Sequence, residues 1–299
     1  MDLKDLMYRA DLMAGQKILI TGGGTGLGRV MAEAALLLGA QVVIAGRRIA
    51  TLEATAAELE AAHGGCVIPL ACDIRDPDSI EAMLDGAWQG RAPTGLINNA
   101  AGNFISRTED LSPKGFDAVA NIVFRGSFLT TLACGKRWLA AGDRASVVSI
   151  VTTWVWNGSP FVVPSAMSKA GVAAMTQSLS VEWGGRGIRF NAIAPGPFPT
   201  EGMTARLKPG EGSDAYADMS ANPIGRVGRM PELANLAVYL LHPGSEYVNG
   251  QVIAIDGGDF QATGGNFSGL RSWTDDQWRE ARTSIRKTDA KQNSATPDN

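Results

Sequence analysis

The sequence predicts an α/β fold, a single doubly wound domain with a parallel sheet, and three observations carry this prediction. Short apolar runs alternate with amphipathic stretches along the chain, which is the pattern of strands joined by crossover helices. The runs are continuously apolar, which favours strands covered on both faces. No linker interrupts the alternation. We therefore expect one domain over residues 1–299, without repeats.

The expected elements follow in order along the chain. The predicted strands cover 17–23, 42–46, 66–73, 95–101, 145–152, 188–196 and 251–258. The predicted helices cover 26–38, 48–62, 77–88, 112–141, 164–183 and 231–241. Pro77, Pro164 and Pro231 each stand near a predicted helix start, where a missing N–H costs little.

Three segments fall outside this alternation. Residues 197–224 follow the carboxyl end of a strand and are rich in Pro, Gly and polar residues, so we expect a substrate loop there. Residues 260–288 form a C-terminal extension that carries Trp273 and Trp278. The last residues, 289–299, are polar and predict a disordered tail.

The charge and hydropathy of the chain exclude some classes of binding partner. The 299-residue chain has a net charge of -3, which provides no broad cationic field for nucleic acid. No window approaches the length of a membrane span, and no targeting segment stands out, so we expect a cytoplasmic protein with no membrane partner. Cys66, Cys72 and Cys134 are scattered, and the sequence predicts no metal site.

A glycine-rich run follows the first predicted strand and opens a helix. It reads Thr21-Gly22-Gly23-Gly24-Thr25-Gly26-Leu27-Gly28. Glycine at 22 and 26 allows a tight turn and close approach to a pyrophosphate, and Gly28 allows the helix to pack close to the strand. Free N–H groups at the helix start attract the phosphates. The run therefore predicts a Rossmann dinucleotide site.

The end of the second predicted strand indicates which dinucleotide binds. NAD sites usually place an acid there for the ribose 2′-hydroxyl, whereas this chain has Arg47 and Arg48. Guanidinium groups bind phosphate bidentately, so the pair favours the 2′-phosphate of NADP(H). Asp73, at the end of the third strand, is placed to accept from the adenine amino group.

These motifs resemble a known family. The glycine run, Asn98-Asn99-Ala100-Ala101-Gly102 and Pro195-Gly196-Pro197 resemble the short-chain dehydrogenase/reductases. Four longer segments resemble the NADPH-dependent 2,4-dienoyl-CoA reductases, especially the mitochondrial type: INNAAGNFIS (97–106), LSPKGF (111–116), FVVPSAMSKAG (161–171) and GGNFSGLRSWTDDQW (264–278). The resemblance covers roughly residues 14–288.

The resemblance implies an activity and a set of roles. Such enzymes deliver hydride from NADPH to the far end of a conjugated dienoyl thioester, and the resulting dienolate is then protonated. By position, Lys169 is expected to hold the nicotinamide ribose, and Asn99 belongs to the cofactor site. The residues expected to line the nicotinamide are Pro195, Gly196, Pro197 and Phe198. Those matching acyl-CoA positions are Arg75, Phe104, Ser112 and Arg206.

The chain departs from the ordinary family pattern at the catalytic tyrosine. The Tyr-x-x-x-Lys frame here reads Ser165 to Lys169, which share one helix face, and Thr152 stands thirteen residues before Ser165. A serine hydroxyl is a far weaker acid than a phenol, so alcohol or ketone chemistry is disfavoured. Dienoyl-CoA reductases share the Ser-x-x-x-Lys form.

The mitochondrial type has an upstream tyrosine and an asparagine that donate to the thioester oxygen. Asn103 is present, but the tyrosine position holds Trp154. An indole N–H donates a hydrogen bond but not a proton. Trp154 is therefore either a second oxyanion donor or an apolar wall of a different pocket, one suited to a ring-bearing acid, which the nearby Trp156 favours. Arg125 either approaches the site or faces an interface.

The leading hypothesis is reduction of a conjugated acyl-CoA thioester by NADPH. The alternatives are a non-catalytic NADP(H)-binding protein, motivated by the missing tyrosine, and a carbonyl reductase of the same fold, which the Ser165 frame opposes. The resemblance also implies a homotetramer.

Overall fold

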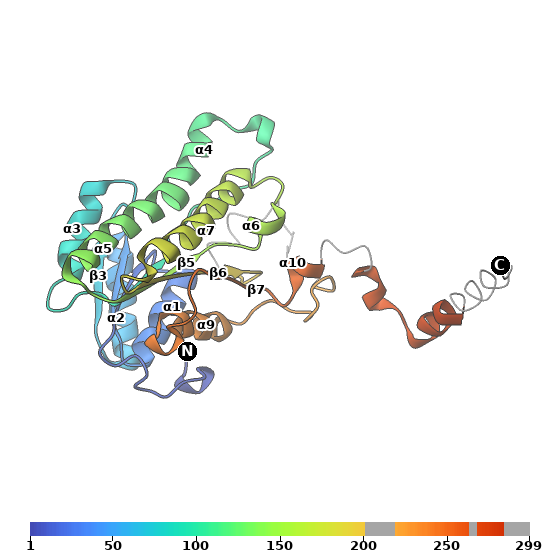
Figure 1. Cartoon of the computed structure of the whole chain (residues 1–299), viewed down its shortest axis with the longest axis horizontal. Helices are drawn as coiled ribbons and strands as arrows, with labels where there is room; N and C mark the ends of the chain where they lie inside the picture. The colour runs from blue at the N-terminus through green and yellow to red at the C-terminus, as the bar shows by residue number, and fades with distance from the viewer. Residues whose placement is uncertain (201–218, 263–267, 284–299) are drawn as a thin grey trace, which may run out of the picture.

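Seven parallel strands form one sheet in a computed structural model that describes residues 1–200, 219–262 and 268–283 (Figure 1). The strand order is β3-β2-β1-β4-β5-β6-β7, so the order reverses between β1 and β4. The strands are β1 (Lys17–Thr21), β2 (Gln41–Gly46), β3 (Val67–Ala71), β4 (Gly95–Asn98), β5 (Ala145–Ile150), β6 (Ile188–Pro195) and β7 (Val252–Ile255). The predicted doubly wound α/β sheet is thereby confirmed, with all seven strands found; β2 ends at the predicted residue, and the other six end one to three residues earlier than the sequence indicated.

The burial of the strands explains their continuous apolarity. Every residue of β1, β4, β5 and β6 is buried, as expected for strands covered on both faces. The edge strands β3 and β7 are less buried. The reversal of order between β1 and β4 leaves a crevice at the carboxyl ends of these strands, which is where open α/β sheets bind ligands.

Helices cover both faces of this sheet (Figure 1). One apolar core lies under α1, α2 and α9, and a second lies under α3, α5 and α7. The helices are α1 (Gly26–Leu37), α2 (Ile49–His63), α3 (Pro77–Ala87), α4 (Pro113–Ala120), α5 (Ser127–Ala141), α7 (Val163–Gly184) and α9 (Met230–Leu241). The six predicted helices are all found, within one residue at most ends.

The long helix predicted at 112–141 contains an interruption that the sequence did not indicate. A π-helical segment, Asn121–Gly126, separates α4 from α5. Gly126 lies so close to the β3–α3 loop that a Cβ there would come within 2.7 Å of the Ile74 side chain. The continuous stretch Pro113–Ala141 has the length and apolarity of a membrane span, but half of it is buried, and its α5 part packs on α3 and α7.

Two four-residue helices flank the carboxyl edge of the sheet and were not predicted. They are α6 (Trp154–Asn157) and α10 (Asp259–Ala262), and Trp156 stacks on Phe260 with ring centroids 4.5 Å apart. The described part of the C-terminal extension reaches away from the sheet (Figure 1). Its two tryptophans, Trp273 and Trp278, contact each other edge to face. The predicted tail at 289–299 lies outside the described residues, as does most of the predicted loop 197–224.

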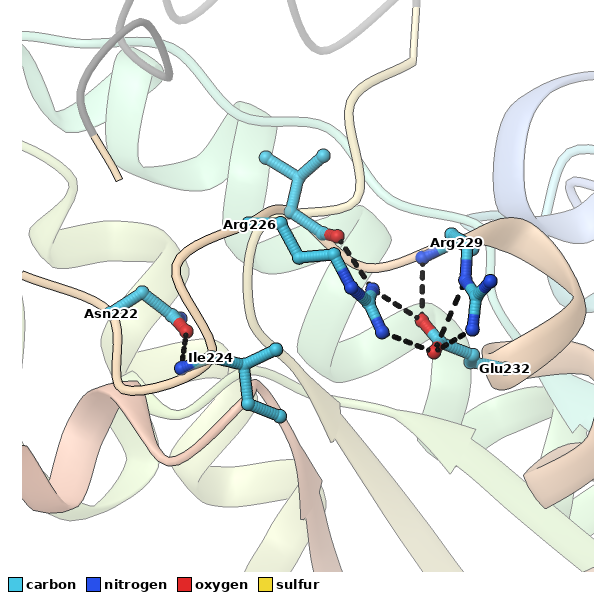
Figure 2. Close-up of polar contacts among 6 residues, drawn as sticks. Asn222, Ile224, Arg226, Arg229 and Glu232 are labelled. Atoms are coloured by element: carbon cyan, nitrogen blue, oxygen red, sulfur yellow. Dashed lines mark hydrogen bonds and ion pairs between the residues drawn. The ribbon is translucent and has the colours of Figure 1, made fainter. Parts of the chain in front are cut away.

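Arg226, Arg229 and Glu232 form a cluster of ionic hydrogen bonds at the start of α9, which we call the clamp (Figure 2). Arg226 donates to both carboxylate oxygens of Glu232, at 3.0 and 2.7 Å. The backbone N–H and the guanidinium of Arg229 donate to the same carboxylate, at 2.8 and 3.0 Å. The hydrogen bonds from Arg226 are the main reason that the pKa of Glu232 falls to about 2.

We expect Glu232→Gln to lower the free energy of unfolding by about 1–2 kcal/mol at neutral pH, because it removes charge-assisted hydrogen bonds. The folded-state pKa of Glu232 lies below the ordinary value of 4.5, so its contribution is complete above pH 4.5 and is lost as the pH falls toward 2. Denaturant unfolding at several pH values measures this difference, which disappears at the acid end.

Glu246→Gln is the matched control. Glu246 pairs with Arg144, but its side chain is 58% exposed, so its loss changes stability by less than about 1 kcal/mol. Equal effects of the two variants at neutral pH would contradict the role given to the clamp.

Candidate functional site

The glycine-rich loop brings α1 close to the carboxyl end of β1. Gly22 and Gly26 adopt φ values of +67° and +54°, which glycine alone takes without strain. A Cβ on Gly28 would lie 2.3 Å from the Gly22 carbonyl oxygen and 2.5 Å from Nδ2 of Asn99. Thr25, the N-cap of α1, makes no capping bond with its side chain. The first N–H groups of α1 are thus available to an anion.

A cavity of about 1150 Å³ runs along this edge and joins most of the predicted cofactor residues to two predicted catalytic residues. The predicted residues that line it are Gly22, Gly24, Thr25, Gly26, Arg47, Arg48, Asp73, Asn99, Asn103 and Ser165. The cofactor loop and the Ser165 frame, which are far apart in sequence, therefore share one cavity.

Other predicted residues lie near this cavity without lining it. Leu27 packs against the core under α1. Gly196 lies so close to Asp256 that a Cβ would come within 2.6 Å of it, and the ring of Phe198 is buried against Gly228. The further residues outside the lining are Trp154, Lys169, Pro195, Pro197, Arg75, Phe104 and Ser112. Arg206 lies outside the described residues.

At the end of the cavity where the sequence predicts the adenosine, two arginines have no ion-pair partner among the described residues. Arg47 and Arg48 are exposed and form no ion pair with any described residue. Arg48 is also the N-cap of α2, where the helix dipole disfavours a cation. Two arginines at this point are electrostatically unfavourable until an anion binds, so the arrangement is that of an anion site.

Asp73 is engaged by a neighbouring arginine. Nε of Arg75 donates to its carboxylate at 2.9 and 3.0 Å, and Nη2 at 2.5 Å. These hydrogen bonds lower the pKa of Asp73. Arg125, in the π-helical segment, donates to the Arg75 carbonyl at 2.6 Å. Arg125 therefore approaches the loop beside the cavity, which is one of the two placements the sequence left open.

Ser165 and Lys169 stand on α7, one turn apart. Both are buried, with exposed fractions of 5% and 8%. Nζ of Lys169 donates to the carbonyl oxygen of Ile150, at the end of β5. Burial lowers the pKa of Lys169 to about 8, because the charged ammonium is removed from water without a carboxylate partner.

Asn103 lines the cavity, and its amide is only partly engaged by described residues. Its Oδ1 accepts from the backbone N–H of Phe104 at 2.9 Å, while its Nδ2 has no partner among the described residues. Trp154 is half-buried on α6 and does not line the cavity. The geometry therefore offers one side-chain donor from the expected pair of Asn103 and Trp154.

Several lining residues were missed at the sequence level. They are Arg29 and Val30 on α1, Ile122 in the π-helical segment, and Thr200 and Met230 on either side of the undescribed loop. Arg29 falls one turn after Gly26, so helical periodicity was a usable signal for it. Nothing in the local sequence marks Ile122. Among the residues that the structure describes, no cluster of three metal-ligating side chains occurs.

Comparisons with known proteins agree with this geometry. Residues 22–259 match the family model described as enoyl-(acyl carrier protein) reductase. The probable 2,4-dienoyl-CoA reductase 3 of Caenorhabditis elegans is 41% identical over 94% of this chain and 92% of its own length. The probable 2,4-dienoyl-CoA reductase of Bacillus subtilis (strain 168) is 38% identical over 83% and 98%.

Solved structures show the same relationship. A short chain dehydrogenase from Bacillus anthracis superposes with a TM-score of 0.75 at 41% identity, covering 83% of this chain and 97% of that one. A gluconate 5-dehydrogenase from Burkholderia cenocepacia, in complex with NADP and tartrate, gives a TM-score of 0.77 at 26% identity, covering 85% and 99%.

The chain belongs to the short-chain dehydrogenase/reductase family, and it is an oxidoreductase of that family. Its named relatives include 2,4-dienoyl-CoA reductases, several of them called peroxisomal. The likeness to dienoyl-CoA reductases is thus confirmed, while the emphasis on the mitochondrial type is not supported by these names. A nicotinamide dinucleotide is the cofactor that membership of this family implies.

The buried lysine gives a testable pH dependence in the cofactor-free protein. The folded-state pKa of Lys169, about 8, lies below the ordinary 10.5. The unfolded chain therefore binds more protons between these values, and wild-type stability rises with pH across that window. We expect a rise of on the order of 3 kcal/mol relative to Lys169→Met, measured by denaturant unfolding from pH 7 to 11.

Lys136→Met, at an exposed position of α5, is the control and should follow the wild-type curve. A Lys169→Met curve parallel to wild type throughout would show that Lys169 is not desolvated.

Proposed function

We propose that this protein transfers hydride from NADPH to a conjugated dienoyl thioester of coenzyme A. The observation that carries the proposal is Ser165, which stands in the tyrosine position of the family and lines one cavity with the cofactor loop and Asn103. A carbonyl reductase needs an acid at this position, whereas reduction of a conjugated thioester needs a donor at the thioester oxygen. The names of the relatives support the same substrate class.

The phosphorylated cofactor is favoured by the charges at the adenosine end. Arg47 and Arg48 have no carboxylate partner among the described residues, and Asp73 is the one acid lining the described cavity. Asp73 is already held by Arg75. A 2′-phosphate would supply the missing negative charge, while a 2′-hydroxyl would not.

The residues present fit a nicotinamide dinucleotide, and different residues would serve binding and catalysis. Gly22 and Gly26 would admit the pyrophosphate at the start of α1. Lys169, which is buried one turn after the cavity-lining Ser165, would bind the nicotinamide ribose. When bound, the cofactor supplies the hydride. Nδ2 of Asn103 would donate to the thioester oxygen, which gains negative charge as the conjugated system accepts the hydride. Carbon protonation is assigned to water, because no described side chain of the cavity near Asn103 is a proton donor of suitable acidity.

A second candidate function is a non-catalytic NADP(H)-binding protein. The observation that favours it is the position of Trp154 outside the cavity lining, which leaves Asn103 without the second oxyanion donor expected of the resemblance. Tight NADPH binding without turnover of any dienoyl-CoA would establish this alternative.

We also propose that the protein assembles as a homotetramer. Four large apolar side chains are 44–84% exposed on the π-helical segment, α5 and α7: Phe124, Phe128, Met167 and Val181. Exposed apolar groups of this size on adjacent helices are typical of an interface between subunits. Sedimentation at equilibrium determines the number of subunits. The expected cytoplasmic location stays a prediction.

The substrate proposal predicts turnover of NADPH with 2,4-dienoyl-CoA thioesters. We expect Asn103→Ala to lower kcat about 10²–10³-fold with little change in NADPH affinity, because it removes the oxyanion donor. The measurement is the loss of reduced-nicotinamide absorbance, with identification of the enoyl product. Absence of wild-type turnover across linear and ring-bearing thioesters would reject the proposal, and recovery of turnover in Trp154→Tyr would then favour the non-catalytic alternative.

The cofactor proposal predicts a selective loss in Arg47→Ala. One charge-assisted hydrogen bond contributes about 1.5–3 kcal/mol, so we expect the Kd for NADPH to rise about ten- to a hundredfold and the Kd for NADH to stay the same. Fluorescence titration measures both constants. Arg144→Ala serves as the control, because Arg144 lies outside the cavity lining and pairs with Glu246 at an exposed position. Equal losses for NADPH and NADH in Arg47→Ala would argue against a 2′-phosphate contact.

A further inference from the structure

Phe161 has a backbone conformation that side chains oppose. Its φ is +63°, the one positive value among the non-glycine residues that the structure describes. In this left-handed region the Cβ crowds the following carbonyl oxygen, and a bulky residue there is a genuine outlier. Three residues earlier, the same loop uses Gly158 at a φ of +68°. A glycine at 161 would satisfy the same geometry without strain.

The backbone at Phe161 has a structural role that does not require the ring. Its carbonyl oxygen accepts from the N–H of Ser106 at 2.9 Å. This bond joins the segment that follows Asn103 to the turn that leads into α7, four residues before Ser165. The bond accounts for the chain path at this point. It does not account for the aromatic side chain, because glycine has the same carbonyl.

The ring is not explained by the core either. Phe161 is 53% exposed, so burial within the described chain compensates for little of the strain. Its hydrogen-bonded neighbour segment carries Phe104 and Ile105, which are 37% and 41% exposed. Single exposed apolar side chains are ordinary, but these three lie on two backbone segments that the hydrogen bond from Ser106 to Phe161 joins. None of the three lines the cavity, but Phe104 directly follows Asn103 and Phe161 stands four residues before Ser165, and both Asn103 and Ser165 line it.

We propose that the ring of Phe161 contacts the acyl chain of the thioester substrate, and that this contact is the role of a phenylalanine at a position that glycine would occupy without strain. The inference rests on the proposed function and extends it by naming a residue that determines acyl affinity. Backbone strain clusters at binding and catalytic sites, so the strained backbone of Phe161, close to Ser165 in the chain, supports a role in substrate binding. All three side chains are apolar, so they suit contact with a hydrocarbon chain and not with the phosphates of coenzyme A.

The test is Phe161→Gly in the full-length protein loaded with NADP⁺. Calorimetric titration with decanoyl-CoA, which cannot be reduced as a dienoyl thioester, measures binding without turnover. We expect the Kd for decanoyl-CoA to rise about ten- to a hundredfold, the factor associated with burying one aromatic side chain. The loss for hexanoyl-CoA should be smaller, and the Kd for free coenzyme A and for NADPH should not change. The thermal midpoint should stay within about 2 °C of wild type or rise, since strain is removed.

Two further variants separate the ring from the backbone. Phe161→Leu keeps an apolar side chain and should retain most of the affinity. Gly158→Ala adds strain at a position with no atom within 4 Å of the new Cβ, so it should lower the thermal midpoint and leave acyl-CoA affinity unchanged.

The outcomes distinguish this inference from the proposed function. Wild-type protein that binds NADPH but no acyl-CoA would overturn the proposed substrate class. Wild-type protein that binds decanoyl-CoA, together with an equal Kd in Phe161→Gly, would overturn the role of Phe161 alone. An unchanged Kd with a smaller assembly on sedimentation would likewise overturn it and assign the ring to a subunit interface.

Discussion

The close approach of Gly28 to Gly22 positions the site. No side chain fits between α1 and the end of β1, since a Cβ on Gly28 would overlap the Gly22 carbonyl. Asn99, at the end of β4, reinforces this contact by donating to the carbonyls of Thr21 and Gly22 at 3.0 and 3.2 Å. The two strands on either side of the topological reversal are thus tied to one helix start. The N–H groups of α1 face the crevice only because this packing is so tight.

Charge is distributed unequally along the cavity that results. At the adenosine end, arginines exceed available carboxylates, because Arg75 already occupies Asp73. Near Ser165, the described donors are the Asn103 amide, the Ser165 hydroxyl and Lys169, whose pKa of about 8 still leaves the ammonium mostly protonated at neutral pH. An anionic cofactor is therefore attracted to one end, while the other end holds fixed dipoles. Fixed dipoles stabilise a developing oxyanion without the reorganisation that water requires.

The sequence was sufficient for the sheet, the helices and the cofactor loop because each depends on local pattern. Continuous apolarity marked buried strands such as β5, and the glycine run marked the start of α1. Features that depend on contacts distant in sequence were not accessible. The burial of Phe198 against Gly228 and the position of Trp154 outside the cavity both arise from tertiary packing. The π-helical turn at Asn121–Gly126 ends at a glycine that packs closely on Ile74, and no local motif marks it.

Departures from local preference concentrate at the catalytic end of the sheet. The long helix adopts π geometry where Ile122 reaches the cavity, Lys169 is buried without a counter-charge, and Phe161 holds a conformation suited to glycine. Ile122 lines the cavity, Lys169 stands one turn after Ser165, and Phe161 stands four residues before it. Strained or desolvated residues of this kind are typical of functional sites, where interactions with a bound ligand offset the stability that the free protein lacks. Burial of a cation is not confined to this end, because Lys17, at the start of β1, is also buried and donates to backbone carbonyls without a carboxylate partner among the described residues. What distinguishes the carboxyl end of the sheet is the positive φ of Phe161 and the π-helical segment beside the cavity.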